Sequence, residues 1–368
     1  MKLKIDTKNH GLVACPVRFA SEKPLFGHSF SLAGKNTVIP VQYAGRTGEG
    51  KHGYVAIVDA LRAKTTETFE LVPSAAKPQA AKAELAEKKV DITLDGGKFT
   101  SYYFGTDIPK PYLGPFFGKN GDPITRHGYT GPEHPHHRNI WFSHGDINGT
   151  DTWNEPEGTH GYIINKQIID IAGGCAYAKF TAKNLWTHHD MSPIADDTTT
   201  VVAYNTPENR RILDVSLTLS ANYGDILLGA TKEAGPVAVR MADELIVPNG
   251  GRIENSFGGV NEGEIWMKRA HWNDYCGAGK SGVVYGVAIL DNPENPGYPS
   301  YFHTRDYGLM APNNFYLGGE QKIPAGKSLT FAYRIVIHEG DTKEAKIAEL
   351  FANYIFPPEA KLLDDTNP

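Results

Sequence analysis

The sequence predicts an all-β protein built on a large antiparallel β-sandwich or barrel, preceded by a small β domain and followed by one helix. Glycine (39) and proline (24) are frequent among the 368 residues, so turns are common, and aromatic residues make up 11% of the chain. Short runs rich in β-branched and aromatic residues recur between these turns. No helical pattern separates the runs, although parallel strands require crossover helices.

Residues 1–75 are predicted to form the small N-terminal β domain. Four extended runs support it: "GLVACPVRFA", "TVIPVQYA", "GYVAIVDAL" and "ETFELVP". Residues 76–90 are rich in alanine and lysine, contain a proline and lack a strong apolar face. We therefore predict a solvated linker there, followed by the large domain over residues 91–368.

The large domain begins with a predicted hairpin, because two glycines interrupt the extended run "VDITLDGGKFTSYYFG". Further runs of strand character follow: "HGYIINKQIIDIAG", "GCAYAKFTAKNLW", "TTTVVAYNT", "RILDVSLTLSA", "ILLGAT", "GVVYGVAILD" and "SLTFAYRIVIHEG". The stretch "TKEAKIAELFANYI" predicts the C-terminal helix. Thr342 is its expected N-cap, and its apolar positions are Ala345, Ile347, Leu350, Phe351 and Ile355.

Composition excludes several classes of function. The net charge is -5 and no long basic run occurs, so no nucleic-acid partner is expected. No apolar stretch approaches ~18 residues, so no membrane span is expected. The N-terminus lacks a signal-peptide core, which predicts a cytoplasmic protein, or a periplasmic or secreted one if a signal was removed. Cys15, Cys175 and Cys276 are too widely spaced for a zinc knuckle. No GxSxG elbow, GxxxxGK[ST] loop or strand–GxGxxG–helix unit occurs, which disfavours serine-hydrolase chemistry and nucleotide binding.

Residues 131–153, "GPEHPHHRNIWFSHGDINGTDTW", are the densest polar stretch. A strand beginning near His136 would place His136, Arg138 and His144 on one face and His137 on the other. His134 and His136 have the H-x-H spacing of some metal proteins, but no glutamate follows, and the HExxH pattern is absent. We therefore predict no metal; the alternative role for these histidines is structural, with backbone hydrogen bonds satisfying buried rings.

Residues 264–277, "EIWMKRAHWNDYCG", interleave aromatic and charged residues. An extended strand would place Trp266, Lys268, Trp272 and Asp274 on one face. Rings that stack on a pyranose, next to charged groups that bind its hydroxyls, are typical of a sugar site. The alternative is a solvated edge strand whose lysine and arginine oppose aggregation.

The third polar stretch is residues 298–315, "YPSYFHTRDYGLMAPNNF". If it is extended, Tyr301, His303, Arg305 and Tyr307 lie on one face. Histidine and tyrosine serve as general acids or bases, and arginine stabilises negative charge. The alternative is a polar network that braces a loop shaped by prolines.

These stretches resemble a bacterial family labelled "methane oxygenase PmoA-like". The similar segments are 110–126, 134–153, 268–277 and 286–315, with the elements HHR, HGDxNGxD and HxRDYG, and the resemblance covers roughly residues 90–340. It implies a β-sandwich of the galactose-mutarotase-like supersandwich class and a role in bacterial carbohydrate use. The label also suggests a metal-dependent oxygenase, in which His134, His136 or His144 and a carboxylate would hold the metal.

We predict a carbohydrate-active enzyme that cleaves or isomerises a sugar or glycoside, as a glycoside hydrolase, lyase or epimerase. The partner would be a small-molecule or oligosaccharide substrate, with no cofactor and no metal. A non-catalytic carbohydrate-binding protein is the alternative. The predicted catalytic residues are His137, His303, Asp306 and Asp274. The predicted substrate-binding residues are Arg126, His136, Arg138, His144, Asp146, Trp153, Lys268, Trp272, Tyr275, Arg305 and Tyr307.

Overall fold

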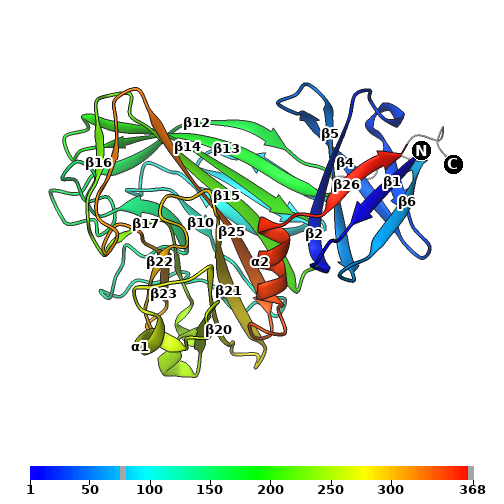
Figure 1. The fold of residues 1–368 in the computed structure, drawn as a ribbon. Helices are drawn as coiled ribbons and strands as arrows, with labels where there is room; N and C mark the ends of the chain where they lie inside the picture. The colour runs from blue at the N-terminus through cyan, green and yellow to red at the C-terminus, as the bar shows by residue number, and fades with distance from the viewer. Residues whose placement is uncertain (75–79, 364–368) are drawn as a thin grey trace.

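The computed structural model describes residues 1–74 and 80–363 and is almost entirely β-structure (Figure 1). Two large antiparallel sheets pack face to face, and a third sheet forms a small separate layer at the N-terminus, as predicted. The helical elements are short: η1 (Phe26–His28), η2 (Asp243–Leu245), η3 (Val247–Asn249), α1 (Asn261–Ile265) and α2 (Ile347–Ile355). In these described ranges no helix is long and apolar enough to cross a bilayer.

The N-terminal sheet has seven strands in the order β2-β5-β4-β3-β6-β1-β26. The four predicted runs correspond to β2, β4, β5 and β6. The last strand in the chain, β26, pairs with β1, so the first and last strands lie side by side in this layer (Figure 1). Residues 359–363 therefore do not belong to the large domain as predicted. The strands are β1 (Lys2–Asp6), β2 (Leu12–Ser21), β3 (Phe30–Ala33), β4 (Val38–Arg46), β5 (His52–Leu61), β6 (Thr66–Pro73) and β26 (Glu359–Leu363).

The nine-stranded sheet has the order β19-β22-β23-β17-β11-β10-β9-β8-β7. Its first strand in the chain lies inside the segment predicted as a linker, because residues 81–85 pair with β8; residues 76–79 of that segment lie outside the described residues. The strands are β7 (Ala81–Leu85), β8 (Lys89–Leu94), β9 (Gly97–Tyr103), β10 (Tyr112–Gly114), β11 (Ile140–His144), β17 (Ala234–Arg240), β19 (Lys268–Arg269), β22 (Tyr301–Thr304) and β23 (Leu309–Pro312).

The eight-stranded sheet has the order β12-β13-β14-β15-β25-β21-β20-β18. A separate pair, β16 (Ile226–Leu228) and β24 (Gln321–Ile323), completes the strands of the large domain. The eight strands are β12 (Tyr162–Ala172), β13 (Tyr177–Thr187), β14 (Pro193–Tyr204), β15 (Arg210–Ser220), β18 (Arg252–Asn255), β20 (Trp272–Ala278), β21 (Val284–Asp291) and β25 (Ser328–Glu339).

The main core lies between the two large sheets. In β15 every second residue from Leu213 to Leu219 is buried in this core. That alternation follows from the two-residue period of a strand, which turns alternate side chains to opposite faces. Burial of each aliphatic side chain stabilises the fold by about 1.5–3 kcal/mol.

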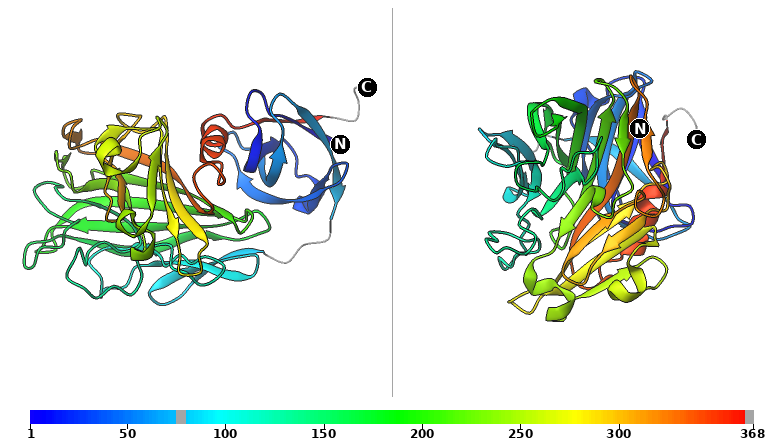
Figure 2. Two further views of the ribbon diagram at one scale, coloured as in Figure 1. Left: turned by 90° about the horizontal axis from the view of Figure 1, so that it is seen from below. Right: turned by 90° about the vertical axis from the view of Figure 1, so that its left-hand side faces the viewer.

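The other face of the eight-stranded sheet is covered by α2 and the N-terminal layer (Figure 2, left). Leu350 and Phe351 of α2 pack with Ala14 and Val55 of the N-terminal sheet. The predicted apolar face of the helix is confirmed, but the helix starts later than predicted, with Lys346 as N-cap. Thr342 is not the cap, because its hydroxyl donates to a buried carboxylate of the sandwich.

Candidate functional site

The outer face of the nine-stranded sheet carries an apolar layer of its own. Trp141, Ala238, Leu309 and Ala311 lie on this face, and Trp153 packs against them from a loop. Their strand neighbours point the opposite way, into the sandwich core. This face therefore has no sheet above it, and loops cover it instead.

The histidine-rich segment is a loop over this layer, and the predicted strand from His136 is wrong. β11 begins at Ile140, and Asn139 before it has a positive φ of 51°. The loop stacks its rings on the sheet face. His137 lies 5.0 Å from the Trp141 ring, His134 lies 4.7 Å from His137, and Tyr307 stacks on His134 at 5.0 Å. Parity along a strand cannot predict this arrangement, because the backbone here is not extended.

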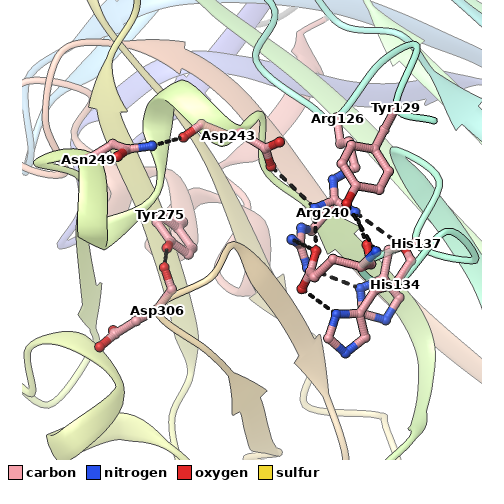
Figure 3. A network of polar contacts seen from close by, with 10 residues as sticks. Arg126, Tyr129, His134, His137, Arg240, Asp243, Asn249, Tyr275 and Asp306 are labelled. Carbon is pink, nitrogen blue, oxygen red and sulfur yellow. Dashed lines mark hydrogen bonds and ion pairs between the residues drawn. The ribbon is translucent and has the colours of Figure 1, made fainter. Parts of the chain in front are cut away.

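Two buried arginines, Arg126 and Arg240, lie beside His134 and His137 at the edge of this stack (Figure 3), and Glu133 joins them. Its Oε2 lies 2.7 Å from Arg126 Nη2 and 2.8 Å from Arg240 Nη2, and its other oxygen contacts His134. Burial alone would raise the pKa of this carboxyl, but the hydrogen bonds from Arg126 and His134 and the charge of Arg240 lower it to about 2. We name Glu133, His134, His137, Arg240, His303, Arg305 and Tyr307 the outer-face cluster.

His137 is a neutral imidazole of defined tautomer. Arg240 Nη1 lies 3.3 Å from His137 Nδ1, and a guanidinium only donates hydrogen bonds, so Nδ1 accepts and Nε2 carries the hydrogen. Burial, together with the charges of nearby histidines and Arg240, holds the pKa of His137 far below its ordinary value. At neutral pH the residue is therefore a hydrogen-bond donor through Nε2 and a poor base.

His303 is held in the same state from another element. The indole Nε1–H of Trp266, which follows α1, donates to His303 Nδ1 at 2.9 Å. Burial and the charge of Arg305 lower the pKa of His303 to about 3. The Arg305 guanidinium lies 5.3 Å from the Tyr307 ring centroid and pairs with Glu262 at 2.8 Å.

A second ion network anchors the loop that carries Trp153. Lys110 is fully buried, and its Nζ donates to the Trp153 carbonyl oxygen (2.7 Å), to that of Thr152 (3.2 Å) and to Glu155 (2.6 Å). Burial lowers the pKa of Lys110 to about 8, and Glu155 opposes that shift. Arg138 pairs with the same carboxylate, with Nη2 2.8 Å from Oε2. Three acceptors occupy the ammonium group, so this lysine has a structural role.

His136 lies beside this network. Its Nε2 is buried without a hydrogen-bond partner in the described part of the chain. Burial and the charge of Lys110 lower the pKa of His136 to about 4. His136 is therefore neutral at physiological pH, like His137.

Asp306 is placed in the turn between β22 and β23 but does not face the histidines. Its backbone N–H donates to Glu262, and its carboxylate accepts from the backbone N–H of Glu262, each at 2.9 Å. The Asp306 carbonyl accepts the hydroxyl of Tyr275, which is fully buried. In Figure 3 the carboxylate points away from Arg126 and Arg240. Asp306 and Tyr275 thus anchor the turn between β22 and β23 to α1 and to β20.

Asp274 and Trp272 lie on the opposite side of the sandwich. Asp274 is fully buried and bonds His338 Nε2 at 2.9 Å and the Thr342 hydroxyl at 2.6 Å. Trp272 is 9% exposed and packs in the layer beneath α2, so it offers no stacking platform. The catalytic role predicted for Asp274 is therefore not supported, because its carboxylate is bonded to His338 and Thr342 on the far face from His303.

The remaining predicted residues lie at the margins of the site. His144 Nδ1 accepts a hydrogen bond from the Asp146 backbone N–H. Burial lowers the pKa of His144 to about 3, and its Nε2 is sealed from solvent. The Asp146 carboxylate accepts from the Gly149 backbone within the following turn. Lys268 is exposed on β19, the end strand of its sheet, which matches the edge-strand alternative.

The histidines named as metal ligands do not converge. His134 bonds Glu133 through Nδ1, and His144 packs against Phe315 of the sandwich core. Over residues 1–74 and 80–363, no group of three or more His, Cys, Asp or Glu side chains is arranged to hold a metal ion. The residues therefore do not fit the metal centre that the oxygenase hypothesis requires.

Two clefts bear on where the site lies. One of about 440 Å³ borders the outer-face cluster and is lined by Arg126, Tyr129, Asp243 and Lys280, among others. The larger, about 570 Å³, lies elsewhere, and its lining includes Phe99, Arg211 and Tyr285. The larger cleft contains none of the predicted site residues. We place the site at the outer-face cluster because oriented histidine donors, arginines and rings gather there.

Sequence reasoning did not name Glu133, Arg240, Lys110 or Glu155 as site residues, and it named Trp266 without its contact to His303. Arg240 had a usable signal: it is a charged residue at the end of the otherwise uncharged run "AGPVAVR", which is buried throughout. Lys110 lies at the start of one of the family-like segments. Glu133 lies inside the densest polar stretch, and Trp266 was named on the aromatic stretch 264–277. Their contacts with Arg240 and His303 carried no signal, since they depend on segments that meet only in the fold.

Comparisons with known proteins place the chain in a family without an assigned activity. No curated protein matches it. Two solved structures from Enterococcus faecalis are similar, an alpha-mannosidase and a protein in the glycosyl hydrolase family 38. Each is 10% identical with a TM-score of 0.45, over 99% of this chain and 46% or 47% of theirs, so the chain spans about half their length. The family of unknown function DUF6807 matches residues 89–352, and the chain belongs to that family.

Proposed function

We propose that the outer-face cluster is the site of a carbohydrate-active enzyme that isomerises or cleaves a sugar or glycoside. One observation carries this proposal: accessible rings and oriented donors share one sheet face. Trp266 is 37% exposed, Tyr307 is partly exposed, and the Arg305 guanidinium lies 5.9 Å and 5.3 Å from their ring centroids. Rings take up the C–H face of a sugar, and N–H donors bind its oxygens.

The protonation states favour chemistry at a carbon beside a carbonyl. Neutral imidazole donors stabilise the negative charge that develops on such an oxygen. Glu133 is a weak base, because its pKa is about 2. The donors would therefore acidify the carbon-bound proton by stabilising the enolate oxygen, and solvent water would accept that proton. Isomerisation or elimination therefore fits the cluster better than simple hydrolysis.

Hydrolysis normally uses two carboxylates that flank the glycosidic bond. The carboxylates nearest the donors, Glu133 and Glu262, are both paired with arginines. Asp274 and Asp306 are committed to bonds elsewhere in the fold. This distribution supports the lyase or epimerase form of the proposal.

The test is a turnover screen over oligosaccharides and over keto- and uronic-sugar derivatives. We expect wild-type turnover of at least one compound, and its loss in His303→Ala and Tyr307→Ala. Tyr223→Ala is the matched control, because this tyrosine is 50% exposed and bonds Asp196, away from the cluster. Turnover that survives both site variants would overturn the proposal.

A non-catalytic carbohydrate-binding protein is the second candidate. The arginine pairing of Glu133 and Glu262 favours it, since no free carboxylate base lies in the cluster. Calorimetric binding without turnover across the same panel, lost in Tyr307→Ala, would select this candidate over the enzyme.

A further inference from the structure

His303 has one ring nitrogen that is fixed and one that is free. The residue lies on the outer face of β22, and its Nδ1 accepts the Trp266 indole hydrogen at 2.9 Å. Its Nε2 has no hydrogen-bond partner among the residues that the structure describes, yet it is not one of the sealed polar atoms. The Nε2 atom is therefore not sealed, although the His303 side chain is only 3% exposed.

The Trp266 contact determines which nitrogen carries the hydrogen. An indole nitrogen can only donate, so the imidazole must accept through Nδ1 and carry its hydrogen on Nε2. Protonating the ring would place a second hydrogen on Nδ1 and break the Trp266 bond. The geometry thus opposes the charged form independently of burial.

The charged and titratable groups that act on His303 are cationic or neutral. They are Arg305 in the following turn, Lys232 before β17, and His134 from the loop over the sheet. Each opposes protonation of the ring, and no carboxylate acts on it comparably. Glu262 pairs with Arg305 and Glu233 pairs with Lys232, so an anion at Nε2 would meet one N–H donor beside two cations that are already paired.

We infer that His303 presents a fixed Nε2–H donor, that Trp266 is its positioning residue, and that the group bound there is the carboxylate of a sugar acid. The substrate class rests on the proposed carbohydrate function, whereas the tautomer does not. A carboxylate accepts a charge-assisted hydrogen bond from such a donor, and a neutral hydroxyl accepts a weaker one.

The tautomer is tested by ¹⁵N NMR of histidine-labelled full-length protein between pH 8 and pH 5. We expect His303 to show a protonated Nε2 and an unprotonated Nδ1, without titration in this range. Trp266→Phe keeps a ring but removes the donor, so His303 should then titrate at higher pH. Tyr316→Phe, beside Trp266, should leave the pattern unchanged. A wild-type His303 with hydrogen on Nδ1, or one that titrates near pH 6.5, would overturn the inference.

The ligand class is tested by calorimetry with D-glucuronate and D-glucose. We expect glucuronate to bind about tenfold more tightly than glucose, the effect of one charge-assisted bond. His303→Leu should abolish that difference, and His303→Gln, which keeps an N–H donor, should retain most of it. If the two sugars bind equally, the assignment of a sugar acid as the ligand is overturned, but the tautomer of His303 is not. Failure to bind any member of the wider sugar panel overturns the proposed function, and the NMR result on the tautomer still stands.

Discussion

Lowering the pH from 7 to 5 should destabilise this protein strongly, because four histidines stay neutral when it is folded. His144 and His303 have pKa values lowered to about 3, and that of His137 is lower still. In the unfolded chain each ring takes up a proton near its ordinary pKa of about 6.5. Their contribution to stability is therefore complete above pH 6.5 and is lost as the pH falls toward the folded-state pKa.

The expected magnitude follows from the proton linkage. Between pH 7 and pH 5 each such histidine removes about 2 kcal/mol from the free energy of unfolding. His136, whose pKa is lowered to about 4, removes nearly as much, so the four histidines together remove about 8 kcal/mol. Asp197 acts in the opposite direction, because burial raises its pKa to about 6 and the folded state binds its proton first. That carboxyl restores about 1 kcal/mol, which leaves a net loss of about 7 kcal/mol.

Urea unfolding at pH 7, 6 and 5, followed by circular dichroism, measures this loss. In His144→Asn the loss should shrink by about 2 kcal/mol, since one titrating ring is gone. His127→Asn is the control, because His127 is exposed and should leave the pH dependence of the wild type intact. If His144→Asn loses as much stability as the wild type between pH 7 and pH 5, the assignment of a neutral buried ring is refuted.

Three further changes test the placement of individual residues. Asp274→Asn should cost about 3 kcal/mol in urea unfolding, because the buried His338 loses its charged partner; sugar binding by calorimetry should not change, and a lost affinity would contradict its place on the far face. Lys110→Met should cost about 2 kcal/mol and make the loop around Glu155 sensitive to limited proteolysis, since its carbonyls lose their donor; an unchanged cleavage pattern would count against this anchor. Trp153→Ala should cost about 3–5 kcal/mol in the same unfolding assay, because its ring fills the layer over the sheet; a loss below about 1 kcal/mol would show that this layer collapses around the gap.

Strands and helices were predictable where the sequence pattern that specifies them lies within the element itself. The runs that became β2, β4, β5 and β6 were recognised because turn residues delimit runs of β-forming residues. The apolar face of α2 was recognised for the same reason, at a period of 3.6. Its start was not, because Thr342 bonds a carboxylate of a strand far away in the chain and does not cap the helix.

The candidate site was predictable as a set of residues but not as a geometry. His137, His303, Arg305 and Tyr307 were all named, and they do share the outer face. Their partners were named incorrectly, since Asp274 and Asp306 bond elsewhere. Parity assigns faces only within an extended strand, and the histidine loop is not extended.

The sequence by itself determined that the chain is all-β, where many of its strands lie, and where its polar chemistry is concentrated. Those properties depend on neighbours within a few residues. Only the tertiary structure decided that Arg240 meets Glu133, that Trp266 orients His303, and that the last strand joins the first. These contacts join residues 37 to more than 300 positions apart, so they depend on which strands pair and which sheet face remains uncovered.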